Sequence, residues 1–377
     1  MKNKLLFQAH WIVGITVGIV LAVMGTTGAL MAFQYPILDA LNAEARTVQV
    51  RGERLPVPVL LERATAEGRK IDARVRFFAL AEEPEMAGRV AFVSDAGEII
   101  RYIDPYSGEW RRGGARGEAL FELLEEIHRG FITDRIAGNA VGRRIVDGCA
   151  VLLVGLVVTG LYLRWPRRTT NWRAWFVIDR RLRGRGFLYS LHSVIGTCVL
   201  PLLLISALTG LYFAYDWYHD MLHRMAGVPV AAESKPKPFV EPNMTAAWSA
   251  FQRETASHSV GTIQIRMPHR EGEVLRVRYL DVDAPHQSAN STINIDPATS
   301  AVLSHERYAD QSTGGKLVAS LFAIHRGHFL GTPGMVLLML SSLALPLFVV
   351  TGWMMYLDRR RVEARQRKRQ AASSVAV

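Results

Sequence analysis

Two apolar stretches of this chain share one spacing. The sequence HWIVGITVGIVLAVMGTTG occupies residues 10–28, and HSVIGTCVLPLLLISALTG occupies residues 192–210. Each stretch begins with a histidine, ends with a glycine eighteen residues later and contains no charged residue. Long uncharged stretches of this kind predict membrane-spanning helices. The repeated spacing therefore predicts two related spans, each with a histidine near one end.

Small residues lie on the same side of each predicted helix as its histidine. With about 100° of rotation per residue, this side holds His10, Gly14, Gly18, Gly25 and Gly28 in the first helix and His192, Gly196, Ala207 and Gly210 in the second. A histidine above a groove of small residues suits a flat cofactor that lies against the helix. Close helix–helix packing, which small residues also permit, is the alternative interpretation.

The apolar residues are concentrated in four blocks, 11–33, 145–165, 187–215 and 335–357. Each block is long enough to cross a hydrocarbon core of about 30 Å. The net charge is +11, and the basic residues cluster before the first block, between the second and third, and after the fourth. The positive-inside rule places these three segments and both termini in the cytoplasm. The expected surroundings are therefore membrane lipid, and nucleic acid is not an expected partner.

The two halves of the chain repeat one order of elements. Each half has a span, a long outer segment of soluble composition, a helix with the sequence IHRG and a second span. The outer segments contain strand-like runs and the matching turns YIDPYSGEW (102–110) and NIDPATSAV (294–302), which predict two small α+β modules. Because each repeat has two spans, both repeats keep the same orientation, related by an axis along the membrane normal.

Seven of the eleven histidines lie at or near span ends. The expected topology places His10 and His192 near the cytoplasmic face, and His128 and His325 near the outer face. Histidine at membrane depth is costly and usually paired or functional, and neutral imidazole is a good axial ligand of haem iron. The two pairs therefore predict two bis-histidine haem sites, one in each leaflet. Capped helix ends and interfacial side chains are the alternative interpretation.

Three further histidines complicate the outer layer. His219 and His223 are spaced i, i+4, and His328 follows His325 at i+3, so each pair is expected on one helix face. His219 or His223 is an alternative to His128 as the partner of His325. Such a face is also an alternative site for a metal ion, although no carboxylate cluster accompanies it in the sequence.

The two arginines that follow the IHRG histidines, Arg129 and Arg326, are candidates to pair with haem propionates, with interfacial anchoring as the alternative. Cys149 and Cys198 lie in predicted spans, and no CxxCH motif for covalent haem is present. The sequence also lacks a dinucleotide-binding glycine fingerprint, a P-loop and a hydrolase motif. Electrons would therefore come from a quinol, a cytoplasmic reductase or a reduced flavin.

Several motifs of the chain together resemble the PepSY-associated transmembrane family. They are the spans that start with histidine, both IHRG motifs, the span ends TGLYL, TGLYF and TGWMM, and the two DP turns. The resemblance covers nearly the whole chain. Within the family, the chain looks most similar to the FoxB-type proteins of bacterial siderophore uptake. It implies a bacterial inner-membrane protein with PepSY-like modules in the periplasm, b-type haem and reduction of ferric siderophores. Trp11 departs from the pattern, because an arginine commonly follows the first histidine.

We therefore expect an α-helical membrane protein with four transmembrane helices in two parallel two-span repeats, plus two small α+β, PepSY-like periplasmic modules. The expected segments are the first transmembrane helix (1–33), the first module (34–117), the first IHRG helix with the second transmembrane helix (118–166), an arginine-rich cytoplasmic loop (167–186), the third transmembrane helix (187–215), the second module (216–315), the second IHRG helix with the fourth transmembrane helix (316–358) and a basic cytoplasmic tail (359–377).

The expected function is that of a haem-dependent ferric-siderophore oxidoreductase with two haem b groups per chain. It would take electrons from a cytoplasmic or quinol donor and pass them across the membrane to a ferric siderophore. A siderophore permease without redox chemistry and a regulatory or adaptor membrane protein are the alternative functions.

Overall fold

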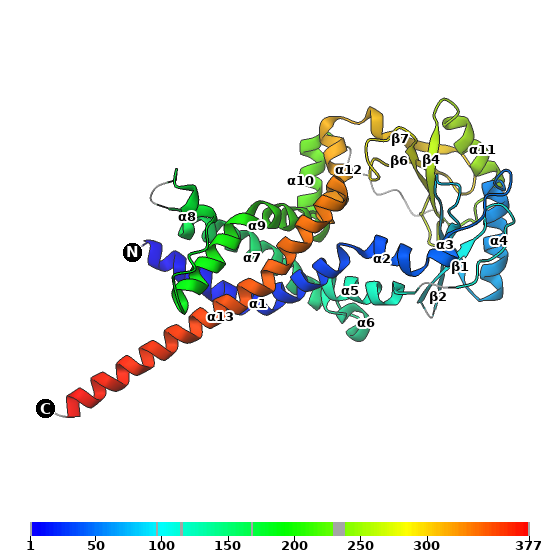
Figure 1. Cartoon of the computed structure of the whole chain (residues 1–377). Helices are drawn as coiled ribbons and strands as arrows, with labels where there is room; N and C mark the ends of the chain where they lie inside the picture. Colours follow the sequence, from blue (N-terminus) through cyan, green and yellow to red (C-terminus); the bar gives the residue numbers. More distant parts are fainter. Residues whose placement is uncertain (1, 96, 114–115, 167–168, 229–237, 376–377) are drawn as a thin grey trace. The chain divides into compact units, whose positions relative to one another are not determined.

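The computed structural model describes residues 2–95, 97–113, 116–166, 169–228 and 238–375 (Figure 1). They form two compact units, each assembled from separate stretches of the chain. The helical unit comprises Met1–Phe33, Phe121–His219 and Phe322–Val377, and the sheet unit comprises Gln34–Leu120 and Asp220–Leu321. Residues 167–168 of the expected cytoplasmic loop and 376–377 of the expected tail lie outside the described residues.

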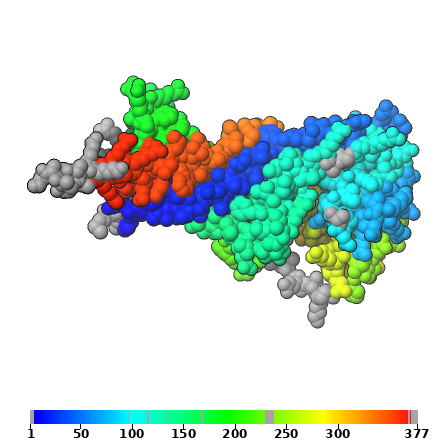
Figure 2. Space-filling view, turned by 90° about the horizontal axis from the view of Figure 1, so that it is seen from below, coloured from blue at the N-terminus to red at the C-terminus, as the bar shows by residue number. Residues whose placement is uncertain are grey.

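Four long helices make up most of the helical unit: α1 (Lys2–Met31), α7 (Val141–Arg164), α9 (Arg185–Ala214) and α13 (Gly331–Val375). Each is long and apolar enough to cross a membrane. Helix α1 packs against α7 and α13, and α9 packs against the same two helices, so the four form a ring. In Figure 2, α1 in blue and α13 in orange and red run side by side along one face.

Leucines from all four helices fill the middle of this ring. Leu21, Leu153, Leu203 and Leu345 are buried, one from each helix. Leu21 and Leu203 each follow the histidine of their span by eleven residues. Equivalent positions in the two halves of the chain therefore contribute to the same apolar layer.

The small-residue stripe of α1 serves helix packing over much of its length. A Cβ atom added at Gly25 would lie 2.5 Å from the carbonyl oxygen of Ser342, and one added at Gly18 would lie 3.2 Å from the side chain of Val349. Both neighbours belong to α13, so these glycines allow the two backbones to approach closely. For this part of the stripe the structure supports the packing interpretation.

The sheet unit contains a seven-stranded antiparallel sheet with the order β3-β2-β1-β4-β5-β6-β7. Its strands are β1 (Arg74–Leu80), β2 (Gly88–Ser94), β3 (Gly97–Ile103), β4 (Val260–Arg266), β5 (Leu275–Asp281), β6 (Ser291–Ile295) and β7 (Val302–Glu306). Strand β1 pairs with β4, with Phe77 opposite Arg266. The strands of the two expected α+β modules therefore belong to one continuous sheet.

Helices α4 (Val57–Lys70) and α11 (Met244–Glu254), one from each half, contact each other and pack on this sheet. Leu60, Phe251 and Ile265 are among the buried residues of their common core. The other helices are α2 (Gln34–Leu41), α3 (Ala43–Arg46), α5 (Glu118–Gly130), α6 (Thr133–Ala137), α8 (Trp172–Phe176), α10 (Asp216–Ala226) and α12 (Thr313–His325), with the 3-10 turns η1 (Tyr308–Asp310) and η2 (His328–Leu330).

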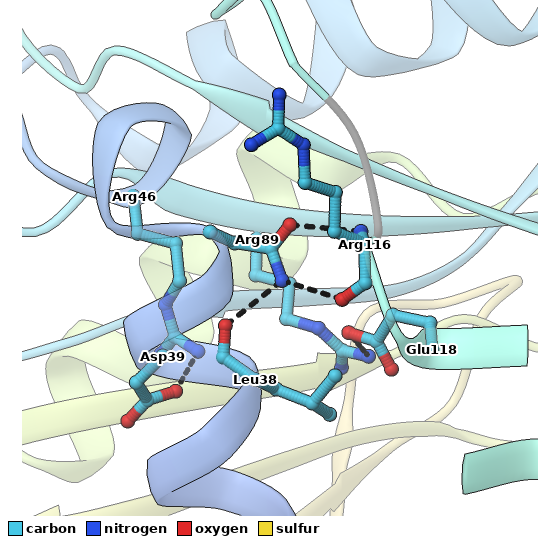
Figure 3. A network of polar contacts seen from close by, with 7 residues as sticks. Leu38, Asp39, Arg46, Arg89, Arg116 and Glu118 are labelled. Carbon is cyan, nitrogen blue, oxygen red and sulfur yellow. Dashed lines mark hydrogen bonds and ion pairs between the residues drawn. The ribbon is translucent and has the colours of Figure 1, made fainter. Parts of the chain in front are cut away.

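The first half of the sheet unit is closed by a polar network centred on Asn42. Figure 3 shows this network with Leu38, Arg116 and Glu118 among its labelled residues. The Asn42 side-chain amide donates to the carbonyl oxygens of Leu38 at 2.8 Å and Arg116 at 3.0 Å, and its oxygen accepts from the Arg116 backbone N–H at 2.8 Å. Arg89 of β2 pairs with Glu118, the first residue of α5, at 3.7 Å. These contacts hold the chain at the point where α5 begins.

Candidate functional site

Four histidines form two groups within the helical unit. His10 belongs to α1 and His192 to α9, and the two rings are close enough to interact electrostatically. His128 belongs to α5, and His325 is the last residue of α12. These two rings also lie within electrostatic range of each other. The structure thus brings together the histidines that the sequence paired.

Each of the four histidines hydrogen-bonds a threonine of a neighbouring helix through its Nδ1 atom. The Nδ1–Oγ1 distances are 2.8 Å for His10 and Thr159, 2.9 Å for His128 and Thr27, 2.8 Å for His192 and Thr351, and 2.9 Å for His325 and Thr209. All four threonines stand directly before a glycine in the sequence. The same contact therefore occurs four times, twice in each half of the chain.

The threonines decide which ring nitrogen carries the proton. Each threonine hydroxyl donates to the backbone carbonyl four residues earlier on its own helix, at 2.7 or 2.8 Å. A hydroxyl has a single proton to donate, so Oγ1 accepts the proton of the histidine Nδ1–H. This network assigns the proton to Nδ1 and leaves a lone pair on Nε2.

Glycines make room for three of the four rings. The distance from an added Cβ atom to the nearest imidazole Cε1 is 3.3 Å at Gly28 (His128), 3.3 Å at Gly160 (His10) and 3.5 Å at Gly210 (His325). At Gly352 the nearest atom lies beyond 4 Å. The sequence predicted that Gly28 and Gly210 line a groove for a cofactor. In the structure they receive an imidazole from the neighbouring helix.

A sequence model of the PepSY-associated TM region matches residues 7–359. The chain belongs to this family. The match spans all four histidines and the threonines that they contact. A search of curated proteins finds no match to the chain.

Of the four threonine-bonded histidines of this PepSY-associated protein, His128 and His325 lie outside the long helices, and both are half-buried. Burial, and to a smaller extent the neighbouring His128, lowers the pKa of His325 to about 4. Burial also lowers the pKa of His128. Because histidine has an ordinary pKa of about 6.5, both rings are neutral at pH 7. The neutral form is the one whose free nitrogen binds a metal.

His219 and His223 lie on α10, so the helical spacing predicted for them is confirmed. The His219 ring lies 4.8 Å from the Tyr212 ring, measured between centroids. Among the residues that the structure describes, no group of three or more His, Cys, Asp or Glu side chains is placed to hold a metal ion. The alternative of a metal ion on this helix face therefore gains no support.

The prediction that His328 shares a helix face with His325 is wrong. Helix α12 ends at His325, and Gly327 has a φ of +78°, in the left-handed region that glycine adopts readily. His328 then begins the 3-10 turn η2. The glycine of the IHRG motif thus separates the two histidines, and it was the signal in the sequence against a continuous helix.

The two candidate arginines have different surroundings. Arg129 pairs with Glu125 at 3.2 Å, one turn earlier on α5, and its side chain is largely exposed. Arg326 donates to the carbonyl oxygen of Met31, the last residue of α1, at 3.3 Å. Its guanidinium also lies 5.5 Å from the centroid of the Phe322 ring. Arg326 therefore caps the end of α1 that carries Thr27.

The threonines are the residues of the candidate site that the sequence analysis missed. Thr159, Thr209 and Thr351 stand in the TGLYL, TGLYF and TGWMM motifs, which supported only the internal repeat. Thr27 stands before Gly28 at the end of the first repeated stretch. A threonine–glycine pair at the end of every span was the available signal. Its meaning depends on which histidine lies across from it, which the sequence does not show.

Proposed function

We propose that this protein is an inner-membrane dihaem b reductase that passes electrons across the membrane to a ferric siderophore. The observation that carries the proposal is the Nδ1–threonine hydrogen bond found at all four histidines. Histidines that ligate metals usually donate their second ring N–H to a fixed partner, which sets the tautomer and orientation of the ring. Four half-buried imidazoles, each with a lone pair on Nε2 that can bind iron, fit two bis-histidine haems.

Under this proposal, His10 and His192 hold one haem and His128 and His325 hold the other, each through Nε2. When bound, haem supplies the one-electron chemistry between ferric and ferrous iron. The threonines orient the ligands, and the leucine layer of the ring excludes water between the two sites. Arg129 and Arg326, next to the second pair in sequence, are the residues that would meet the propionates.

The separation of the two pairs suits a path across the membrane. His10 and Thr27, which holds His128, are both on α1 and seventeen residues apart. At about 1.5 Å per residue this corresponds to about 25 Å along the helix, close to the thickness of a hydrocarbon core of about 30 Å. The basic link between α7 and α9 supports a cytoplasmic position for the His192 end of the helices. The loops that form the sheet unit would then be periplasmic.

The substrate assignment is supported by the resemblance to siderophore-uptake members of the family. One electron per iron converts Fe(III) to Fe(II), which is a poorer match to the hard oxygen ligands of a siderophore, so the iron is released. A permease or an adaptor protein would not require four ligand histidines with one fixed tautomer.

The proposal is tested with the full-length, haem-loaded protein in sealed vesicles. Dithionite is trapped inside, and a ferric siderophore with a ferrous chelator is added outside. We expect the coloured ferrous chelate to form in proteoliposomes and not in vesicles without protein. A double variant, His128→Ala with His325→Ala, should fall to the protein-free rate. An equal rate for the double variant and the unaltered protein would contradict the proposed path.

A further inference from the structure

An open cavity of about 1020 Å³ lies beside the first turns of α9. Its walls come from the link between α7 and α9, including α8, and its floor includes Tyr189, Ser190 and Ser193. The Asp179 backbone N–H donates to the hydroxyl of Ser190 at 2.9 Å, which joins the segment before α9 to the first turns of α9. A cavity of this size accommodates a ligand as large as a nucleotide.

Four of the residues that line the cavity are arginines. They are Arg164, Arg173, Arg180 and Arg181. Arg164 donates to the carbonyl oxygen of Ala174 and so braces the wall. The acid in the lining, Asp179, accepts the Arg181 backbone N–H at 3.0 Å. Guanidinium groups bind phosphate through paired hydrogen bonds, so the cavity favours a phosphorylated ligand.

Two aromatic side chains accompany these arginines. Phe176 and Tyr189 line the cavity, and each is more than half exposed. Exposed aromatic rings offer faces on which a planar ring stacks. The lining therefore combines phosphate-binding groups with a surface for a flat aromatic system.

The cavity is close to one of the proposed haem ligands. Tyr189 and Ser193, which line it, lie three residues before and one residue after His192 on α9. One turn of an α-helix rises about 5.4 Å. A ligand in the cavity would thus sit within about one helical turn of the histidine that we assign to the first haem.

We propose that this cavity binds a phosphorylated flavin of the mononucleotide class and that its reduced form delivers electrons there. The inference rests on the proposed function. Nicotinamides transfer hydride, whereas flavins also transfer single electrons, as reduction of haem iron requires. Oxidation of one flavin hydroquinone releases two electrons and two protons. The electrons balance the reduction of two irons from ferric to ferrous, and the protons pass to water.

Binding is tested by titrating oxidised flavin mononucleotide into the full-length protein in nanodiscs of phosphatidylcholine, with flavin fluorescence as the readout. We expect saturable binding at one site per chain. Arg173→Gln and Arg181→Gln should each weaken binding about tenfold, the effect of losing one charge-assisted contact. Arg183→Gln is the matched control, because Arg183 belongs to the same link, is exposed and lies outside the lining. Its affinity should equal that of the unaltered protein.

Two further ligands identify what the cavity recognises. Riboflavin, which lacks the phosphate, should bind about tenfold more weakly than the mononucleotide. Vesicles of phosphatidylglycerol should not displace the bound flavin. Absence of saturable binding, equal binding of riboflavin, displacement by the anionic vesicles, or an equal loss in Arg183→Gln would each overturn the inference.

The binding measurement needs no haem, so it separates the two proposals. A red protein that binds no flavin overturns the flavin site and leaves the dihaem reductase standing. A colourless protein that binds flavin with the expected arginine dependence contradicts the reductase and leaves the flavin site standing. A haem count equal to that of the unaltered protein in each arginine variant shows that the helices are intact.

Discussion

The two histidine pairs reach the same hydrogen-bond arrangement from different parts of the fold. His10 and His192 lie within the long helices α1 and α9, whereas His128 and His325 lie on the shorter helices α5 and α12. Each ring nevertheless directs Nδ1 to a threonine of a neighbouring helix. The element common to both pairs is therefore the threonine contact and not the kind of helix that carries the histidine.

The pairs differ in what supports each ring. Both rings of the second pair and the ring of His10 pack against glycines. His192 lies instead beside Phe348, with 4.8 Å between ring centroids, and Gly352 has no atom near its missing Cβ. In the second pair both rings therefore pack against a glycine, whereas in the first pair only the His10 ring does.

The largest expected effect comes from removing one ligand of either pair. His192→Ala and His325→Ala should each lose about half of the haem absorbance, because each removes a ligand of one site. After reduction with dithionite, the His192→Ala protein should still reduce a ferric siderophore through the second site, and the His325→Ala protein should not. The readout is the ferrous chelate formed on the outer side of sealed vesicles.

His258→Ala, which changes a histidine of the sheet unit, is the control for this experiment and should retain both haems. The helices of the two ligand variants keep their apolar and small-residue contacts, so both proteins should fold. Equal reduction of the siderophore by His192→Ala and His325→Ala would show that the two sites are not ordered along one path.

A smaller effect is expected from the threonines. Thr27→Val removes the acceptor for His128 Nδ1–H and should weaken haem retention at the second site by about 10- to 100-fold, as loss of such a partner does at other metal sites. Thr26→Val is the matched control, because Thr26 is exposed and donates to the Ala22 carbonyl at 2.8 Å. Transfer of haem to apomyoglobin measures the loss. Equal rates of haem transfer from Thr27→Val and Thr26→Val would show that the threonine contact does not contribute to haem retention.

The smallest effect is expected from the glycines. Gly28→Ala places a Cβ atom 3.3 Å from His128 Cε1, so the ring has to shift by a few tenths of an ångström. We expect altered electron paramagnetic resonance g-values for the second site with both haems retained. Gly352→Ala, with open space at its Cβ position, should leave the spectrum unchanged. A spectral change in Gly352→Ala and none in Gly28→Ala would contradict the described support of the rings.

The sequence predicted the features that depend on local pattern. Apolar length located the four long helices, and alternation with turn residues located the strands. The DP turns formed as expected, since Asp104 and Asp296 each accept two backbone N–H groups from the residues that follow. These features could be predicted because each depends on a short stretch of chain.

The features that the sequence did not predict depend on contacts between distant residues. Pairing of β1 with β4 joins residues almost 190 positions apart, such as Phe77 and Arg266. The partnership of His192 with Thr351 is a contact of the same kind, 159 positions apart. Periodicity describes which face of an element is apolar, and it carries no information on which partner covers that face.

The central claim is that the four histidines hold two haems, and a haem count tests it most directly. The full-length protein is purified from haem-replete cells, and its pyridine haemochrome spectrum is compared with the protein concentration. The account predicts two haem b groups per chain, both released by acidified organic solvent because no CxxCH motif attaches them. A colourless protein would contradict the account, and the four histidine–threonine contacts would then require another explanation.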